Sequence, residues 1–190
     1  MGQKALDNDW VDVIAADWAR QRPDVNTEGL NVIGRISRLS RYLERAIETT
    51  FEAHRLNSAG FYVLAALRRS EPPHRLSPTE LYSSLLVSSG AMTNRLDRLE
   101  ESGLVTRVPD AVDGRSSLVA LTSKGRALTD KLIERHAANE VRLLSALSAQ
   151  ERAVLAGLLR KLLLGFDDRP KPSRPADSEP EVAASRGGKA

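Results

Sequence analysis

Two short helices joined by a tight turn are encoded in residues 77–103, and this pair limits the fold more than any other feature of the chain. The stretch SPTE, residues 77–80, places a serine at the N-cap, proline in the first helical position and glutamate at the third, which is a capping box. The helix that it opens ends near Leu86, and Ser88 or Ser89 caps the next helix. Two helices joined in this way form a helix-turn-helix.

The second helix of the pair has two unlike faces. Met92, Leu96 and Leu99 recur at i, i+4 and i+7 and form an apolar side, and Gly103 supplies the permissive backbone that ends the helix. The opposite side has few of the long side chains that usually cover a solvated helix; it carries Ser89, Gly90, Thr93, Asn94, Asp97 and Arg98. Such a face predicts the close approach of another surface. A polar face without a partner is the alternative.

A β-hairpin follows the helix pair. LVTRVP (residues 104–109) and SSLVALT (residues 116–122) are β-type runs, and Asp113-Gly114 between them is typical of a hairpin turn. A helix-turn-helix followed by a hairpin is a winged helix. The predicted fold class is therefore mainly α with a small β-hairpin wing.

The winged helix assigns a task to the polar face. In this geometry the second helix enters the major groove of DNA with its N-terminal residues against base edges and phosphates. Hydroxyl, amide and guanidinium groups then supply the contacts, and we expect them from Ser88, Ser89, Thr93, Asn94 and Arg98. Arg115, at the tip of the hairpin, would reach the neighbouring minor groove or backbone.

Longer helices flank this region. The pattern predicts helices over residues 7–20, 30–53, from 122 to about 147, and from 148 to 164. The second of them carries an apolar stripe near heptad spacing, which fits either a dimer interface or an ordinary core helix. Residues 166–190 are rich in proline, serine and charge, and we expect them to be disordered.

Composition excludes several classes of function. The chain has no cysteine, so disulfides, thiolate metal sites and cysteine nucleophiles are absent, and no two of its three histidines stand at i, i+4 spacing. No cofactor, no metal and no catalytic constellation is expected. Residues 68–115 hold seven basic and seven acidic side chains, so a DNA-binding role rests on the placement of arginines rather than on net charge. Without an apolar run of about 18 residues or a signal peptide, the expected location is cytoplasmic.

The hairpin also carries a family pattern. Asp110, Asp113 and Arg115, followed by the run Leu121, Thr122 and Gly125, resemble the wing motif of the MarR family of winged-helix regulators, and the resemblance extends over nearly the whole chain to Gly165. It implies a homodimer whose N- and C-terminal helices intertwine, acting on palindromic double-stranded DNA with half-sites about one turn, roughly 34 Å, apart. It also implies an effector-relieved transcriptional repressor.

A narrower resemblance points to an effector site. An extra N-terminal helix and the stretch LNSAGFYVLAALRRS look like the urate-responsive branch of the family, whose effector residues correspond to Trp18, Tyr62, Arg95 and Arg107 here. The branch has aspartate where this chain has Tyr62, whose phenol carries no charge at neutral pH. Independently of the resemblance, Arg95 lies at the edge of the apolar stripe, where a guanidinium needs an anion or carbonyl partner. A small anionic or aromatic effector such as urate is therefore expected.

Plainer roles are open for the same residues. Trp18 and Tyr62 fit core or dimer packing, and Arg107 fits an ion pair with Asp110 or Glu101. Two rival functions follow: a DNA-binding regulator of this fold that does not respond to an effector, and a helical dimer that acts only through protein partners. The expected division of the chain is an extra N-terminal helix and linker (1–28), dimerisation helices (29–56 and 122–165), a winged helix-turn-helix (57–121) and the tail (166–190).

Overall fold

The computed structural model describes residues 8–110, 117–166 and 168. The chain divides into two compact units, residues 1–148 and residues 149–190. The first unit holds the helix-turn-helix and the wing strands, and the second holds the last helix, α7 (Ala149–Gly165), none of whose side chains is buried.

The predicted helix-turn-helix is present as α4 (Pro78–Ser84) and α5 (Ser89–Glu101). Both hydrogen bonds of the capping box form: the Ser77 hydroxyl accepts one from the backbone N–H of Glu80 at 3.2 Å, and the Glu80 carboxylate accepts one from the N–H of Ser77 at 2.7 Å. Ser88 caps α5 by accepting the N–H of Ala91 at 3.3 Å. The turn between the helices contains Leu86, which has a left-handed backbone and is 80% exposed.

The end of α5 directs the chain into the wing. Gly103 adopts φ 66°, and the N–H groups of Gly103 and Leu104 bond to the carbonyls of Glu100 and Leu99 at 2.8 and 2.9 Å. This is a Schellman cap, in which a left-handed glycine satisfies the last carbonyls of the helix. The strand β2 (Val105–Pro109) therefore starts in a fixed direction from α5.

The wing strands form an antiparallel sheet of order β1-β3-β2, with β3 spanning Ser117–Leu121. Its third strand, β1 (Arg75–Leu76), pairs Leu76 with Val119 and was not predicted. It precedes the helix-turn-helix directly, so the sheet ties the start of α4 to the wing.

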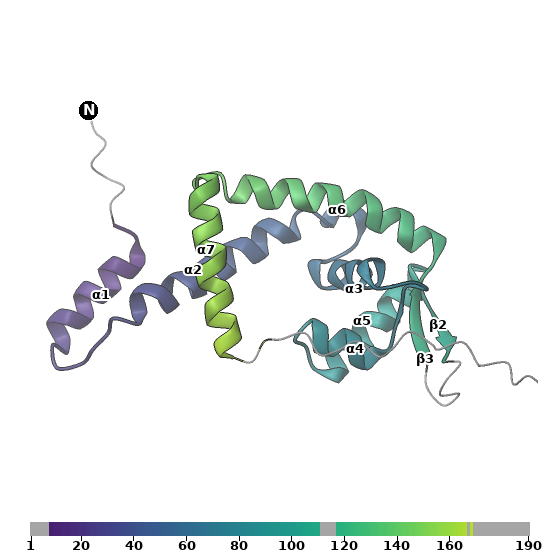
Figure 1. The fold of residues 1–190 in the computed structure, drawn as a ribbon, viewed down its shortest axis with the longest axis horizontal. Helices are drawn as coiled ribbons and strands as arrows, with labels where there is room; N and C mark the ends of the chain where they lie inside the picture. The colour runs from purple at the N-terminus through teal and green to yellow at the C-terminus, as the bar shows by residue number, and fades with distance from the viewer. Residues whose placement is uncertain (1–7, 111–116, 167, 169–190) are drawn as a thin grey trace, which may run out of the picture. The chain divides into compact units, whose positions relative to one another are not determined.

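The core of the first unit is built around α3 (Ser58–Arg69), whose N-cap is Asn57. α3 lies between α6 (Ser123–Leu143) and the α4–α5 pair (Figure 1). Apolar side chains from all of these elements and from the sheet interlock in one cluster, which includes Phe51, Phe61, Leu64, Leu67, Leu81, Met92, Leu96, Leu99, Leu104, Val119 and Leu132.

Two helices are shorter than predicted. α2 (Leu30–Glu48) ends five residues before the expected Ala53, and a 3-10 turn, η1 (Glu52–His54), follows. The early end lets Phe51 turn into the core, where its ring stacks on Phe61 with centroids 4.4 Å apart. Burial of a large aromatic ring thus outweighs continuation of the helix. α6 likewise ends at Leu143 rather than near Leu147.

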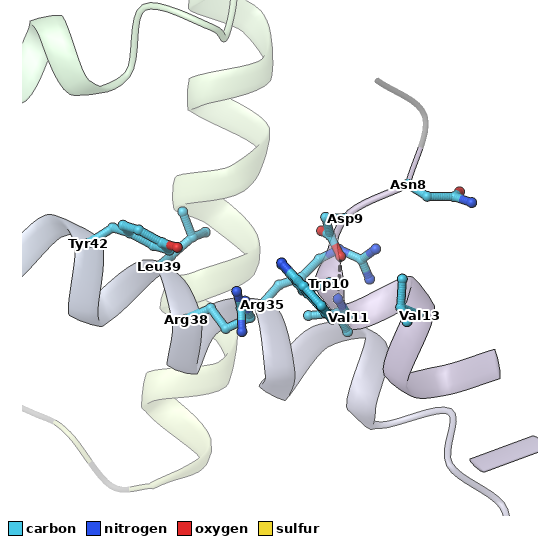
Figure 2. A pocket seen from close by; sticks show the side chains of 9 residues that line it. All are labelled: Asn8, Asp9, Trp10, Val11, Val13, Arg35, Arg38, Leu39 and Tyr42. Atoms are coloured by element: carbon cyan, nitrogen blue, oxygen red, sulfur yellow. Dashed lines mark hydrogen bonds and ion pairs between the residues drawn. The ribbon is translucent and has the colours of Figure 1, made fainter. Parts of the chain in front are cut away.

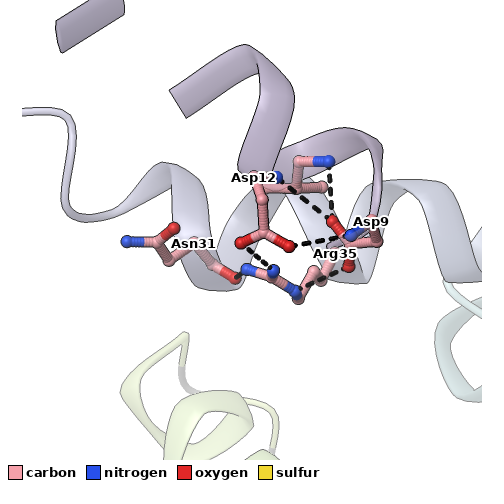
Figure 3. Close-up of polar contacts among 5 residues, drawn as sticks. Asp9, Asp12, Asn31 and Arg35 are labelled. Atoms are coloured by element: carbon pink, nitrogen blue, oxygen red, sulfur yellow. Dashed lines mark hydrogen bonds and ion pairs between the residues drawn. The ribbon is translucent and has the colours of Figure 1, made fainter. Parts of the chain in front are cut away.

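The extra N-terminal helix, α1 (Trp10–Gln21), packs against α2. Val11 is buried against the surface that Gly34 leaves open. Arg35 of α2 binds the carboxylates of Asp9 and Asp12 at 2.9 and 2.7 Å (Figure 3). Hydrogen bonding from Arg35 holds the pKa of Asp12 below its ordinary value, so this pair remains charged at neutral pH.

The contact between α6 and the start of the wing generates a prediction about stability. A Cβ on Gly125 would overlap the backbone carbonyl of Leu104, which cannot move without shifting β2. We expect Gly125→Ala to lower the free energy of unfolding by about 1–3 kcal/mol, measured by urea denaturation, because overpacking distorts the backbone. Gly90→Ala, in the first turn of α5 with open space around it, is the matched control and should be neutral or slightly stabilising. Equal stability of the two variants would contradict this packing account.

Candidate nucleic-acid interface

The packing of α5 decides which of its side chains face outward. Met92, Leu96 and Leu99 are at most 4% exposed and hold the helix on the core of the first unit. The N-terminal end and the outward side of the helix are exposed, and they carry the residues predicted to contact DNA: Ser88, Ser89, Thr93, Asn94 and Arg98. These five side chains therefore share one accessible surface.

The hydrogen-bonding groups on this surface are mostly available. The Thr93 hydroxyl donates to the carbonyl of Ser89 at 3.1 Å and retains its acceptor lone pairs. Within residues 8–110, 117–166 and 168, the side chains of Asn94 and Arg98 make no hydrogen bond or ion pair. An amide and a guanidinium without protein partners can bind base edges and phosphates.

The wing supplies a second element beside α5. β2 and β3 are paired from Val105–Leu121 to Pro109–Ser117, so the hairpin expected from the sequence is formed up to its tip. The tip itself, residues 111–116, lies outside the described residues, and with it the predicted contact residue Arg115.

The predicted effector residues come from four different elements. Trp18 is on α1 and is 46% exposed, and α1 packs on α2 rather than on α5. Tyr62 is on α3, half-buried, with its ring centroid 5.8 Å from those of Phe61 and His136. Burial, together with the charges of Glu140 and Glu48, raises the pKa of Tyr62, so the phenol is neutral at physiological pH. The charged groups that act on Tyr62 are acidic and do not by themselves attract an anion.

Arg95 and Arg107 lie on different flanks of α5. Arg107 of β2 forms ion pairs with Asp97 at 2.5 Å and Glu100 at 3.3 Å, instead of the Asp110 or Glu101 considered from the sequence. At 100° per residue, Arg95 projects about 140–160° away from these two acids. Arg95 is half-buried and has no hydrogen-bond or ion-pair partner among the described residues. The structure of one chain therefore does not gather Trp18, Arg95 and Arg107 into one site.

The acids that hold Arg107 were not identified from the sequence as functional. Asp97 and Glu100 stand at i, i+3 spacing on one flank of α5, which is a signal for a shared cation. The cation itself comes from a strand, and helix periodicity does not indicate which strand residue faces that flank.

No group of three or more metal-ligating side chains occurs in the part of the chain that the structure describes. No helix in the described ranges combines the length and the apolar character needed to span a membrane.

Comparisons with known proteins agree with this geometry. A sequence model of the MarR family matches residues 56–116. The chain is 37% identical over 152 residues to the HTH-type transcriptional regulator PecS of Dickeya dadantii (strain 3937), covering 80% of this chain and 92% of PecS.

Solved structures give the same result. A mutant of MarR from E. coli complexed with operator DNA matches with a TM-score of 0.64 and 30% identity, over 73% of this chain and 99% of that one. Bordetella bronchiseptica BpsR, whose DNA binding is regulated by 6-hydroxynicotinic acid, matches with a TM-score of 0.63 and 25% identity, over 69% and 91% of the two chains. With the helix-turn-helix, the wing strands and these relatives, the chain belongs to the MarR family of DNA-binding transcriptional regulators, which are not enzymes.

Proposed function

We propose that this regulator is a homodimeric repressor that binds palindromic DNA through α5 of each protomer and is relieved by a small effector. The observation that carries the DNA-contact assignment is the division of α5 into a buried apolar side and an exposed side of short polar groups. In this assignment Ser88, Ser89, Thr93, Asn94 and Arg98 contact the major groove and its phosphates, and Arg115 of the wing contacts the adjacent backbone or minor groove.

Dimerisation is supported by apolar surface that the chain leaves uncovered. α2 has no buried side chain, and large apolar residues of α1 and α2 are between 36% and 64% exposed: Trp10, Val13, Ile14, Trp18, Val32, Ile33, Ile36, Leu39 and Tyr42. A groove of about 500 Å³ lies on this surface, with Trp10, Leu39 and Tyr42 among its lining residues (Figure 2). Apolar surface of this extent is typical of a protein interface.

The second unit has the same character. α7 exposes a leucine-rich surface along its whole length, including Leu155, Leu158, Leu159, Leu162 and Leu163. We therefore assign residues 29–56 and 122–165 to dimerisation, 57–121 to DNA binding, and 1–28 to an additional helix and linker that widens the interface. The tail from residue 166 has no assigned role.

The effector assignment has support from relatives and from one residue. BpsR responds to an aromatic acid, 6-hydroxynicotinic acid, and Arg95 is a half-buried cation with no protein partner among the described residues. Trp18, Tyr62, Arg95 and Arg107 are the candidate contacts that the family resemblance gives for a small anionic or aromatic ligand such as urate, although one chain does not gather Trp18, Arg95 and Arg107 into one site. Linkage then explains relief: a ligand that binds the DNA-free arrangement better lowers DNA affinity.

A regulator without an effector is the second candidate. It is favoured by Tyr62, which replaces the carboxylate of the urate-responsive branch. It is also favoured by the ion pairs of Arg107 with Asp97 and Glu100, which compete with an anionic ligand for the guanidinium. Action through protein partners alone is not compatible with membership of a DNA-binding family.

The DNA assignment predicts different effects for the loss of a base contact and for the loss of a phosphate contact. Asn94→Ala should weaken binding to the DNA upstream of the regulator's own gene by about tenfold to a hundredfold, because an amide–base contact contributes about 1–3 kcal/mol. Arg98→Ala should lower the slope of log affinity against log salt by about one, as expected for one phosphate contact. Fluorescence anisotropy at several fixed salt concentrations measures both quantities. Wild-type affinity in both variants would contradict the assignment of α5.

The dimer assignment predicts that one charge on the uncovered face separates the protomers. Leu39→Glu should shift the protein from dimer to monomer in analytical ultracentrifugation, because a carboxylate would be desolvated in the interface. Ser37→Glu is the matched control, since it adds the same charge about 160° around the same exposed helix. A dimer that survives Leu39→Glu and dissociates with Ser37→Glu would place the interface on the other side of α2.

The effector assignment predicts a role for the Tyr62 hydroxyl. Urate should release the protein from DNA, and Tyr62→Phe should raise the urate concentration for half-release by about threefold to tenfold, the value of one hydrogen bond. Tyr42→Phe, which removes a hydroxyl from the 61% exposed ring of α2, should leave that concentration unchanged. Binding that neither urate nor 6-hydroxynicotinate disturbs would favour the regulator without an effector.

A further inference from the structure

Arg107 lies on β2 at the edge of the core, on the strand face that is buried closer to the start of the strand. Val105 and Arg107 are two residues apart on β2 and share one face of the strand. Val105 is 2% exposed, whereas the side chain of Arg107 is 42% exposed and lies beyond the edge of the core. This face is directed toward α5, so Arg107 meets the flank of the helix rather than open solvent.

Three contacts join Arg107 to α5. Its guanidinium binds Asp97 at 2.5 Å through Nη2 and Glu100 at 3.3 Å through Nε, and its backbone N–H donates to Glu100 at 3.2 Å. All three side chains are between 41% and 49% exposed, so each ion pair by itself adds little to global stability. Their value lies in orientation: they connect a strand of the wing to the helix beside it.

We propose that Arg107 is a positioning residue for DNA recognition, which fixes the rotation of α5 about its axis and its angle to the wing through Asp97 and Glu100. The inference rests on the proposed function, in which α5 and the wing contact DNA together. It gives Arg107 a role that needs no contact with DNA or with an effector.

The anchoring of α5 explains why such a residue is needed. Its apolar anchors Met92, Leu96 and Leu99 all lie on one side, so contacts on a flank of the helix add a separate restraint on rotation about its axis. A rotation of about 20° moves a side-chain tip by about 2 Å, more than a hydrogen bond to a base edge tolerates. The Arg107 contacts restrain the flank that runs beside Thr93 and Asn94.

The two acids provide a test, because positioning and simple electrostatics predict opposite changes in DNA affinity when a carboxylate is removed. A carboxylate on a DNA-binding helix repels phosphates, so its removal should strengthen binding if charge alone matters. If Asp97 acts by holding Arg107, its removal should weaken binding. Glu101 is the matched control, because it is an exposed carboxylate on the same helix that does not contact Arg107.

The experiment compares Asp97→Ala, Arg107→Ala and Glu101→Ala in the full chain, by anisotropy on operator DNA across a salt series. Alanine favours helix, so α5 is retained, which circular dichroism checks. We expect about tenfold weaker binding for Asp97→Ala and for Arg107→Ala, the coupling typical of contacting charged pairs. The double variant Asp97→Ala/Arg107→Ala should bind no more weakly than Arg107→Ala alone. In all these variants the slope of log affinity against log salt should stay at the wild-type value. Glu101→Ala should bind as tightly as wild type or more tightly.

Two results would overturn the inference. If the Asp97→Ala variant binds DNA as tightly as the Glu101→Ala variant, the ion pair between Arg107 and Asp97 does not position α5. A salt slope lowered by about one in Arg107→Ala, with Asp97→Ala unaffected, would mean that Arg107 contacts phosphate directly. Failure of the proposed function is distinguished by Asn94→Ala and Arg98→Ala: if both variants bind as wild type does, α5 is not the reading helix.

Discussion

The burial of one side of α5 is the constraint on which the winged helix-turn-helix depends. Met92, Leu96 and Leu99 join the cluster built around α3, and this fixes which side of the helix faces outward. Capping by Ser88 and the Schellman turn at Gly103 then fix where the helix begins and ends. The short polar residues on the outer side are thus presented by a rigid, core-anchored element, which is what close approach to a nucleic acid requires.

A second constraint is the apolar surface that one chain does not cover. The winged helix buries its own core, whereas α1, α2 and α7 each carry large exposed apolar residues. Within the first unit, the Arg35 ion pairs and Val11 attach α1 to α2, so the additional helix extends the uncovered surface. In the proposed dimer, a second copy of the chain would cover this apolar surface and supply the second recognition helix that a palindromic operator needs.

Local signals explain most of what could be predicted from the sequence. Capping residues act within four positions, so the predicted starts of α4 at Ser77 and of α6 at residue 122 are confirmed, and Ser88 is the cap of α5 among its two predicted candidates. Interactions that are distant in the sequence were missed. The periodic pattern predicted that α2 would run to Ala53, because it contains no information on the stacking of Phe51 on Phe61. That stacking stabilises the fold more than a longer helix would. The two-residue strand β1 is too short to have a pattern and exists only because β3 is beside it.

The candidate site divides in the same way. The exposed contact face of α5 follows from a helical repeat and was predictable, whereas the partners of Arg107 depend on how β2 meets α5. Resemblance to a family assigned Arg95 and Arg107 to one effector site, and the fold of one chain directs them to different flanks. Residue types can be matched along a sequence, whereas the ion pairs that redirect a side chain depend on tertiary contacts.

The most direct test of the account is a hydroxyl-radical footprint of the full chain on the DNA immediately upstream of its gene. A dimer that presents two α5 helices predicts two symmetric protected half-sites whose centres lie one helical turn, about 10–10.5 base pairs, apart. A single unsymmetrical footprint, or no protection even at low salt, where phosphate contacts are strongest, would contradict the claim that paired α5 helices read a palindrome.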